Sequence, residues 1–220
     1  MSPINEWGVV RTSPAGHSSL TNQPSTLDPS GATVVIDFFA KAILDGRGFQ
    51  VRAGTITTPL VGDVVITDTA AEMSVDAVAG QVIIPVYQCI GGRLMTGTLH
   101  EYATKSVATV SSAGAAFVLL PLKSGGAAAV LTARVAAAGG VTVTAELATT
   151  TLRHWNYASP AAGPTGTTNI MMPLIEWEPL RPPVLNGARS LYVQIAATGT
   201  GPSYYASLDV LEFTSAQLGQ

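Results

Sequence analysis

Residues 190–213 read SLYVQIAATGTGPSYYASLDVLEF, and this stretch decides the fold class. Its first part alternates apolar and polar side chains, with Leu191, Val193 and Ile195 on one face, which is the two-residue period of a β-strand. GTG at 199–201 then supplies a turn, and a second strand pattern follows it. The stretch is therefore predicted to be the hairpin that closes a β-sandwich.

The second strand of this hairpin changes its pattern once. Ala206, Leu208 and Val210 share one face, whereas Leu211 and Phe213 occupy the other. A β-bulge inserts one residue into a strand and bends it. A bulge is therefore predicted near Val210 and Leu211, with the last apolar residues turned towards another surface.

Short β-patterns fill the chain from Phe49 to this hairpin, with no helix pattern between them. All-β content of this kind indicates a β-sandwich. The long segment 155–185 exceeds a hairpin loop and suits the crossings of a jelly roll or another Greek-key sandwich. Besides the closing hairpin, the predicted strands are FQVRAGTITT, MSVDAV, QVIIPVYQCI, HEYATKSVATV, AFVLLPL, AVLTARVAA and VTVTAELATT.

QVIIPVYQCI, at 81–90, is apolar on both faces. This strand is either central in a two-layer core or pressed against a neighbouring subunit. Pro85 and Pro121 each remove a donor from the β-ladder, so both are predicted to lie at a sheet edge or a bulge.

One helix is predicted before the first strand, in SGATVVIDFFAKAILDGRG at 30–48. Thr33, Asp37, Lys41 and Asp45 place one polar stripe along it, and its wide apolar girth indicates packing on more than one side. We expect an Asp37–Lys41 pair, Ser30 as N-cap and a left-handed stop at Gly46 or Gly48. A strand beginning at TVVIDFF is the alternative. The predicted organisation is an N-terminal arm at 1–30 anchored by Trp7, a helical segment at 31–48 and a β-sandwich at 49–215.

The chain of 220 residues has few charges, at 11% of its residues, and a formal net charge of −3. Its scattered arginines form no basic stripe, which argues against a nucleic-acid partner. No signal peptide or membrane span is visible, so synthesis and assembly in a cytoplasm are expected. The single Cys89 is predicted to be a buried small hydrophobe. A surface so poor in charge is typical of one covered by other protein; an ordinary β-domain that uses Ser and Thr for solubility is the alternative.

No motif carries chemistry, so no catalytic, cofactor or metal site is predicted. AGHSSL at 15–20 lacks the second glycine of a nucleophile elbow. His17, His100 and His154 lack the close spacing of zinc ligands and are expected at the surface or in turns. Most acidic side chains are predicted to face outward, and Asp63 and Asp68 lack the calcium-loop pattern around them. The aromatic residues favour an intersubunit contact over a sugar-stacking platform; these are Trp155, Tyr157, Trp177, Tyr204 and Tyr205.

With this pattern, the chain resembles bacteriophage virion proteins of the jelly-roll type, meaning head, decoration or cement subunits. The resemblance is carried by the polar N-terminal arm, by AGTITTPLVGDVVITDTAAEMSVDAVAGQVIIPVY at 53–87, and by the closing hairpin at 191–213. It implies a non-enzymatic subunit of the virion, assembled in the host cytoplasm.

The expected partners are copies of the chain itself, with a trimer preferred, and other virion proteins, without nucleic acid or membrane. The predicted interface residues are Trp7, Trp177, Leu180, Pro182, Leu211 and Phe213. A receptor- or carbohydrate-binding module of a phage tail or fibre is the alternative, and an enzyme comes third.

Overall fold

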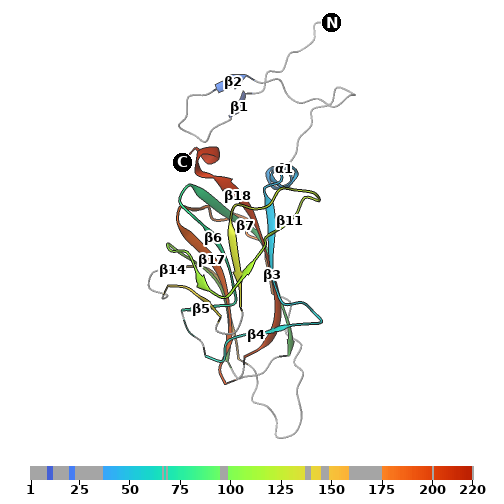
Figure 1. Cartoon of the computed structure of the whole chain (residues 1–220), viewed down its shortest axis with the longest axis vertical. Coiled ribbons are helices and arrows are strands. Elements are labelled where there is room, and N and C mark those ends of the chain that lie inside the picture. The colour runs from blue at the N-terminus through green and yellow to red at the C-terminus, as the bar shows by residue number, and fades with distance from the viewer. Residues whose placement is uncertain are drawn as a thin grey trace.

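The computed structural model of the chain describes residues 9–11, 20–22, 37–65, 67, 69–94, 99–136, 140–144, 149–158, 175–199 and 201–219. Two antiparallel β-sheets lie face to face in it (Figure 1). Helix α1 lies at one end of the sandwich and the segment with β4 at the other. The all-β sandwich predicted from the sequence is confirmed, as is a short helix before its first strand.

Sheet I has the strand order β11–β3–β18–β7–β15, and sheet II has the order β10–β12–β6–β17–β8–β14. The eight principal strands are β3 (Gly48–Ala53), β6 (Met73–Ala77), β7 (Gln81–Leu94), β8 (Leu99–Val107), β14 (Thr149–Ala158), β15 (Ile175–Trp177), β17 (Arg189–Ala197) and β18 (Ser203–Thr214). The other strands are β1 (Val9–Arg11), β2 (Leu20–Asn22), β4 (Leu60–Val61), β5 (Ala70–Ala71), β9 (Ser112–Ala113), β10 (Ala115–Phe117), β11 (Leu120–Pro121), β12 (Thr132–Val135), β13 (Val141–Thr142) and β16 (Leu185–Asn186).

The eight principal strands pair in a nested order. The first pairs with the last (β3 with β18), the second with the seventh (β6 with β17), the third with the sixth (β7 with β15), and the fourth with the fifth (β8 with β14). All four pairs are antiparallel. This nesting is the strand order of a jelly roll.

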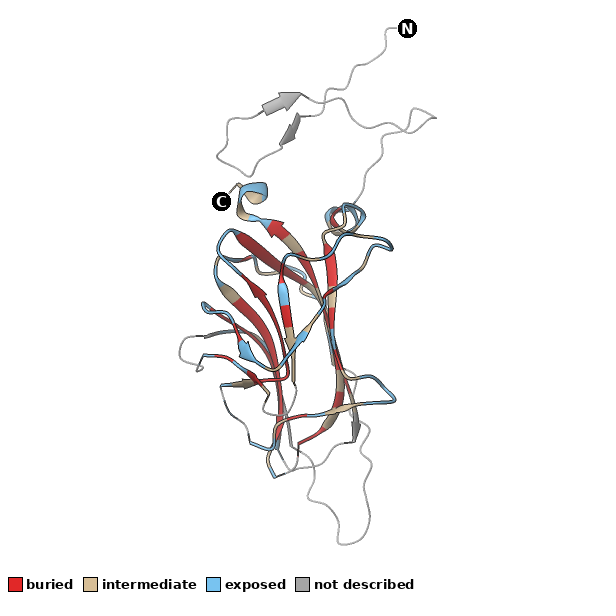
Figure 2. Cartoon of the chain, in the orientation of Figure 1, coloured by how far each residue is buried: buried red, intermediate tan, exposed pale blue. Residues whose placement is uncertain are grey.

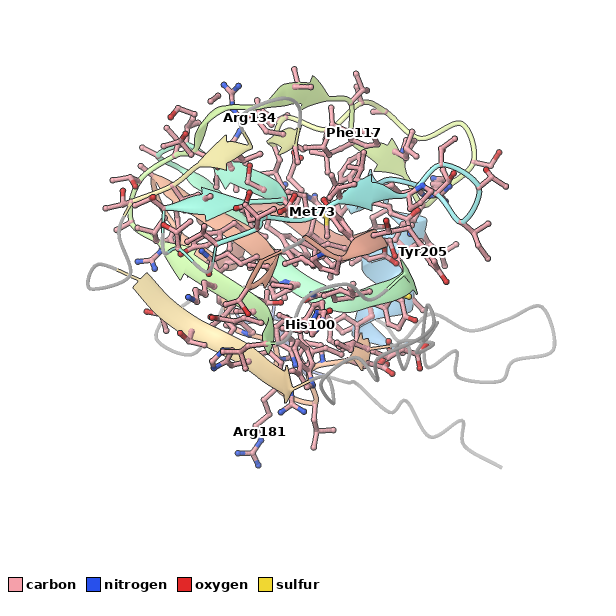
Figure 3. The ribbon with its side chains drawn as sticks, turned by 90° about the horizontal axis from the view of Figure 1, so that it is seen from below. Met73, His100, Phe117, Arg134, Arg181 and Tyr205 are labelled. Atoms are coloured by element: carbon pink, nitrogen blue, oxygen red, sulfur yellow. The ribbon has the colours of Figure 1, made fainter. Side chains whose placement is uncertain are left out.

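The core lies between the two sheets, where their buried stretches face one another (Figure 2), and it is mainly apolar. Leu191, Val193 and Ile195 of β17 point into it, as their alternation predicts. They meet Leu208 and Val210 of β18 in the same cluster. Met73 lies at the centre of the view along the sandwich (Figure 3). The hairpin at 190–213 thus contributes one strand to each sheet and spans the core.

The described residues between β8 and β14, 108–136 and 140–144, form an insertion that extends both sheets at the same edge. Strands β12 and β10 add to sheet II beyond β6, and β11 adds to sheet I beyond β3. Leu119 and Leu131 of this insertion are buried in the core. Pro121 lies in the edge strand β11, which confirms its predicted edge position.

A third, small sheet of order β5–β13–β9 covers part of the outer face of sheet II. Val141 and Val143 pack there with Tyr192 of β17 and Val107 of β8. Because Tyr192 alternates with the inward-facing Leu191, its side chain lies on the outer side. The insertion therefore buries apolar surface on both sides of sheet II.

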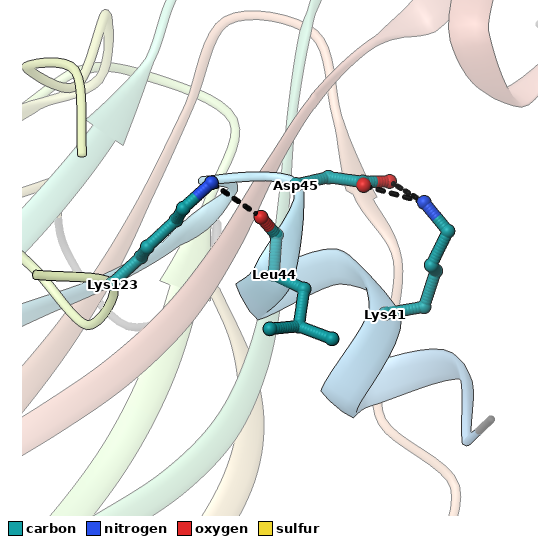
Figure 4. Close-up of polar contacts among 4 residues, drawn as sticks. All are labelled: Lys41, Leu44, Asp45 and Lys123. Carbon is teal, nitrogen blue, oxygen red and sulfur yellow. Dashed lines mark hydrogen bonds and ion pairs between the residues drawn. The ribbon is translucent and has the colours of Figure 1, made fainter.

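Helix α1 (Phe38–Leu44) begins later than the predicted helix, because Asp37 is its N-cap. The Asp37 carboxylate accepts hydrogen bonds from the backbone N–H groups of Phe39 and Ala40 at 2.8 and 3.2 Å. Ser30 is thus not the cap, and the expected Asp37–Lys41 pair is replaced by Lys41–Asp45, with Nζ–Oδ distances of 2.5 and 2.6 Å (Figure 4). Gly46, at φ +77°, supplies the predicted left-handed stop.

The prediction that this helix is packed on more than one side is wrong within the single chain. Ala42 is its one buried residue, while Phe39 and Ile43 pack partly against the outer face of sheet I. Phe38 and Leu44 remain about half exposed, at 52% and 56%. The apolar surface of α1 is therefore wider than the part of it that sheet I covers.

The predicted bulge lies in the partner strand instead of in β18. Asp209 pairs with Tyr87 and Val210 pairs with Pro85, so the extra residue is Val86 of β7. The register of β18 with β3 runs without a break past this point. Pro85 thus sits at a bulge, as predicted.

Leu211 and Phe213 lie on the outer face of β18 together with Asp209, so the strand does not change face. They are buried because α1 and Leu218 of the 3₁₀ helix η2 (Ser215–Leu218) cover this end of sheet I. Along the outer face of β18, the side chains change from polar to apolar at the point where α1 and η2 begin to cover the sheet.

The long loop predicted at 155–185 is shorter in the structure, because strands occupy both ends of this segment. Strand β14 continues through Ala158, and β15 and β16 lie within the later part. Trp155 and Trp177 lie in strands, but the prolines and glycines in this segment favoured the prediction of a loop. Residues 159–174 lie outside the described part of the chain.

Candidate interaction surfaces

The predicted interface residues fall into three groups. Trp7 lies outside the described residues. Trp177 and Pro182 are half-buried, whereas Leu180 is 95% exposed. All three belong to residues 177–185 (WEPLRPPVL), which we call the proline segment and which runs from the last residue of β15 into β16. Arg181, next to Leu180, points away from the sandwich (Figure 3). A fully exposed leucine beside prolines is an apolar anchor on a backbone of restricted conformation.

Leu211 and Phe213, the other two predicted interface residues, pack within this chain. They form a cluster with Val82 and Ile84 of β7 and Ala42 of α1. The Phe213 ring stacks on Phe38 at a centroid distance of 5.9 Å. The Arg47 guanidinium lies 5.1 Å from the centroid of the same ring. Both side chains are used to dock α1 and leave little area for a partner.

A second exposed apolar surface lies on the insertion, at Val118, Leu120 and Val130, and we call it the insert edge. Their exposed fractions are 80%, 41% and 68%. The insertion is fixed to the sandwich by polar contacts on either side. The Glu212 carboxylate of β18 accepts the backbone N–H groups of Val130 and Leu131 at 2.9 and 3.0 Å. Residue-by-residue strand patterns did not show that these apolar side chains would stay exposed.

The insert edge is joined to the end of helix α1. Lys123 Nζ donates to the Leu44 carbonyl oxygen at 2.7 Å (Figure 4). This carbonyl is one of the unpaired acceptors at the helix C-terminus, where a cation also complements the helix dipole. Leu44 thereby lies beside the insertion, and its exposed side chain adds apolar area to that end of the molecule.

A third apolar surface lies at the opposite end of the sandwich, on residues 60–65, which we call the strap. Val61, Val64 and Val65 of the strap are more than half exposed. The backbone of the strap bonds to the β17–β18 turn: Gly62 N donates to Pro202 O at 2.8 Å and Gly199 N to Val64 O at 3.2 Å. The strap is thus attached through its backbone while its three valine side chains face outward.

Under the strap lies a buried carboxylate, Glu72, which contradicts the prediction that the acidic side chains face outward. Glu72 is 3% exposed. Its Oε2 accepts the Tyr204 hydroxyl at 2.7 Å, and its Oε1 accepts the Asp63 backbone N–H at 3.0 Å. Burial raises the pKa of Glu72 to about 7. The hydrogen bonds from Tyr204 and from the Asp63 backbone N–H oppose this shift, and the Asp63 carboxylate adds to it.

Asp76 is also buried, against the same prediction. Its carboxylate accepts the backbone N–H of Ser111 at 3.0 Å and the hydroxyl of Ser111 at 2.6 Å. Ser74 exchanges a further hydrogen bond with that hydroxyl at 2.8 Å. These contacts tie the insertion to β6. No local pattern in the sequence distinguishes such buried carboxylates from exposed ones, because their partners are distant in the chain.

The outer face of sheet I carries two polar contacts below α1. Tyr87 Oη donates to Glu176 Oε1 at 2.7 Å, and Gln50 Nε2 donates to Asp209 Oδ1 at 2.6 Å. Cys89 lies on this face and is half-buried, so the prediction of a buried core cysteine is wrong. Partial burial and the nearby Glu176 carboxylate raise the pKa of the Cys89 thiol.

The aromatic residues do not form one platform among the described residues. Tyr204 is buried in the core, whereas Tyr205 points to the outer face of sheet I (Figure 3). The Tyr205 ring lies directly over Gly91 of β7, where an added Cβ would come within 2.2 Å of it. Trp155 lies on β14 of the other sheet, with Arg153 stacked 5.0 Å from its ring centroid.

The two described histidines are divided between the core and the surface, and His17 lies outside the described residues. His100, expected at the surface or in a turn, is buried on the inner face of β8, and its ring stacks on Tyr102. His154 lies on β14 with Nε2 3.2 Å from the Glu101 carboxylate. Within the described residues, no three His, Cys, Asp or Glu side chains are grouped to hold a metal ion.

The comparisons with known proteins identify no relative of this chain. Searches of protein families, of curated proteins and of solved structures found no match to this chain. Among the helices of the described part of the chain, none has the length and apolar character needed to cross a membrane. The argument for a function therefore rests on the fold and on its surfaces.

Proposed function

We propose that the chain is a structural subunit of a virion, a capsid or capsid-decorating protein that assembles through protein–protein contacts. The observation that carries this proposal is the set of three exposed aliphatic surfaces on a jelly roll of low charge: the proline segment, the insert edge and the strap. Exposed apolar area of this kind is typical of surfaces that are covered in an assembly.

The partners proposed are copies of the chain, with a trimer preferred, and other virion proteins in a particle formed in the host cytoplasm. Leu180 is the proposed anchor of the proline segment because almost its whole side chain is free to be buried. Burial of an exposed leucine yields about 2 kcal/mol before the ordering costs of association are subtracted. Several such anchors are needed to hold two subunits together.

A Leu180→Asp variant tests this proposal. The wild-type chain is expected to form an oligomer at micromolar concentration in light scattering, and the variant is expected to shift at least tenfold towards monomer. Val78→Asp is the control, because Val78 is an exposed aliphatic side chain, at 53% against 95% for Leu180, that lies outside the three surfaces. A wild-type monomer that binds a glycan and no virion component would overturn the proposal and favour the receptor- or carbohydrate-binding module.

A further inference from the structure

Glu72 contacts four other segments of the chain, three of which are distant in sequence. Its side chain holds Tyr204 of β18 and the backbone of Asp63 in the strap. Its backbone N–H donates to Val193 O of β17 at 2.8 Å, and its carbonyl accepts Ala136 N, just after β12, at 2.7 Å. A change at the Glu72 carboxylate therefore acts directly on the attachment of the strap.

The carboxylate of Glu72 has no cationic partner among the described residues packed against it. From β18 it faces the Tyr204 hydroxyl, and from the strap it faces the Asp63 carboxyl group. Arg134, on β12, instead donates to the Ala113 carbonyl at 3.1 Å. Burial without a cation disfavours the ionised form of Glu72, and a second carboxylate nearby disfavours it further.

The strap is packed tightly against the turn that it covers. Gly62 and Gly201 approach so closely that a Cβ on Gly201 would lie 1.8 Å from the Gly62 carbonyl oxygen. Asp63 O also accepts Ala197 N at 2.9 Å. The Glu72 side chain is buried beneath these contacts.

We propose that Glu72 is a proton-controlled latch: in its neutral form it holds the strap closed on the β17–β18 turn, and its ionisation favours an open strap in which the carboxylate is hydrated. The strap carries Val61, Val64 and Val65, so the same proton changes how this apolar surface is presented. The latch is independent of the identity of any partner.

The sign of the pH effect follows from linkage. The pKa of Glu72 is about 7 in the closed form, and a hydrated glutamate has a pKa of about 4.3. The closed form therefore binds the proton more tightly than the open form, so closure is favoured fully below the lower value and weakens as pH rises towards 7. At higher pH, where Glu72 is ionised in both forms, the equilibrium between the closed and the open strap becomes independent of pH.

Hydrogen–deuterium exchange of the full chain tests the latch. After correction for intrinsic exchange, protection of the Gly62 and Asp63 amides is expected to fall at least about tenfold between about pH 5.5 and about pH 8. In Glu72→Gln, which keeps the shape but cannot ionise, protection of the same amides is expected to be constant. Asp209→Asn, an acidic position on the outer face of sheet I, is the control and should behave as the wild type.

Two results would overturn the latch: protection in the wild type that does not depend on pH, or an equal pH dependence in Glu72→Gln. If Glu72→Gln does not fold, the carboxyl ¹³C resonance of Glu72 in the wild type replaces it. A titration of that resonance near neutral pH, in step with the strap amides, supports the latch. A titration at the value of an ordinary glutamate contradicts it.

Discussion

At the scale of single residues, we expect substitutions to be most destabilising where the backbone leaves no room for a side chain. Gly201 is one, since it packs against the strap backbone. Gly187 differs, because it has φ +87° and open space around its Cβ position. Glycine is therefore required at the two positions for different physical reasons: close contact at Gly201 and backbone conformation at Gly187.

Gly201→Ala is expected to lower the free energy of unfolding by about 3 kcal/mol, because the new methyl group forces the strap away from the β17–β18 turn. Gly187→Ala, the control, is expected to cost about 1 kcal/mol for its left-handed backbone alone. Urea denaturation of both variants checks the difference. Equal losses would contradict the close contact between Gly201 and Gly62.

At the scale of elements, α1 is held by a small core of its own on the outer face of sheet I. Phe213 is central to it, because it contacts Phe38 by stacking and Arg47 through its ring face. This cluster is separate from the main core between the sheets. The helix is therefore expected to depend on Phe213 more than the two sheets do.

Phe213→Ala is expected to reduce the free energy of unfolding by about 3 kcal/mol and to remove the exchange protection of the α1 amides. Val118→Ala is the control, because Val118 is mostly exposed and its truncation should change stability by less than about 0.5 kcal/mol. Denaturant unfolding with hydrogen exchange measures both effects. An α1 that keeps its protection in Phe213→Ala would show that other contacts dock the helix.

At the scale of the whole molecule, the buried clusters of the described chain are built from Phe39 onward. The insertion between β8 and β14 closes one edge of the jelly roll, and α1 caps one end of sheet I. The described sandwich thus has a core of its own. The predicted N-terminal arm, with Trp7 as anchor, remains a prediction.

A variant that lacks residues 1–36 is expected to fold and to keep its free energy of unfolding within about 1 kcal/mol of the full chain, since the three clusters remain intact. Urea denaturation followed by circular dichroism measures this quantity. A truncated chain that is unfolded, or that loses several kcal/mol, would show that the first 36 residues contribute to the core.

The sequence by itself determined the fold class. Local alternation, as in β17, requires only that one face of a strand be apolar, and glycine turns separate the strands; both signals act between near neighbours. The positions of Pro85 and Pro121 were predictable for the same reason, because a missing N–H restricts proline wherever the strand lies.

Only the tertiary structure decided what covers each face. Leu211 and Phe213 seemed to mark a bend, but their burial depends on α1, which lies about 170 residues earlier in the chain. The burial of Glu72 depends in the same way on Tyr204, which lies 132 residues later in the chain. A local pattern records the polarity of a side chain, whereas its partner is set by which distant segments the nested strand order brings together.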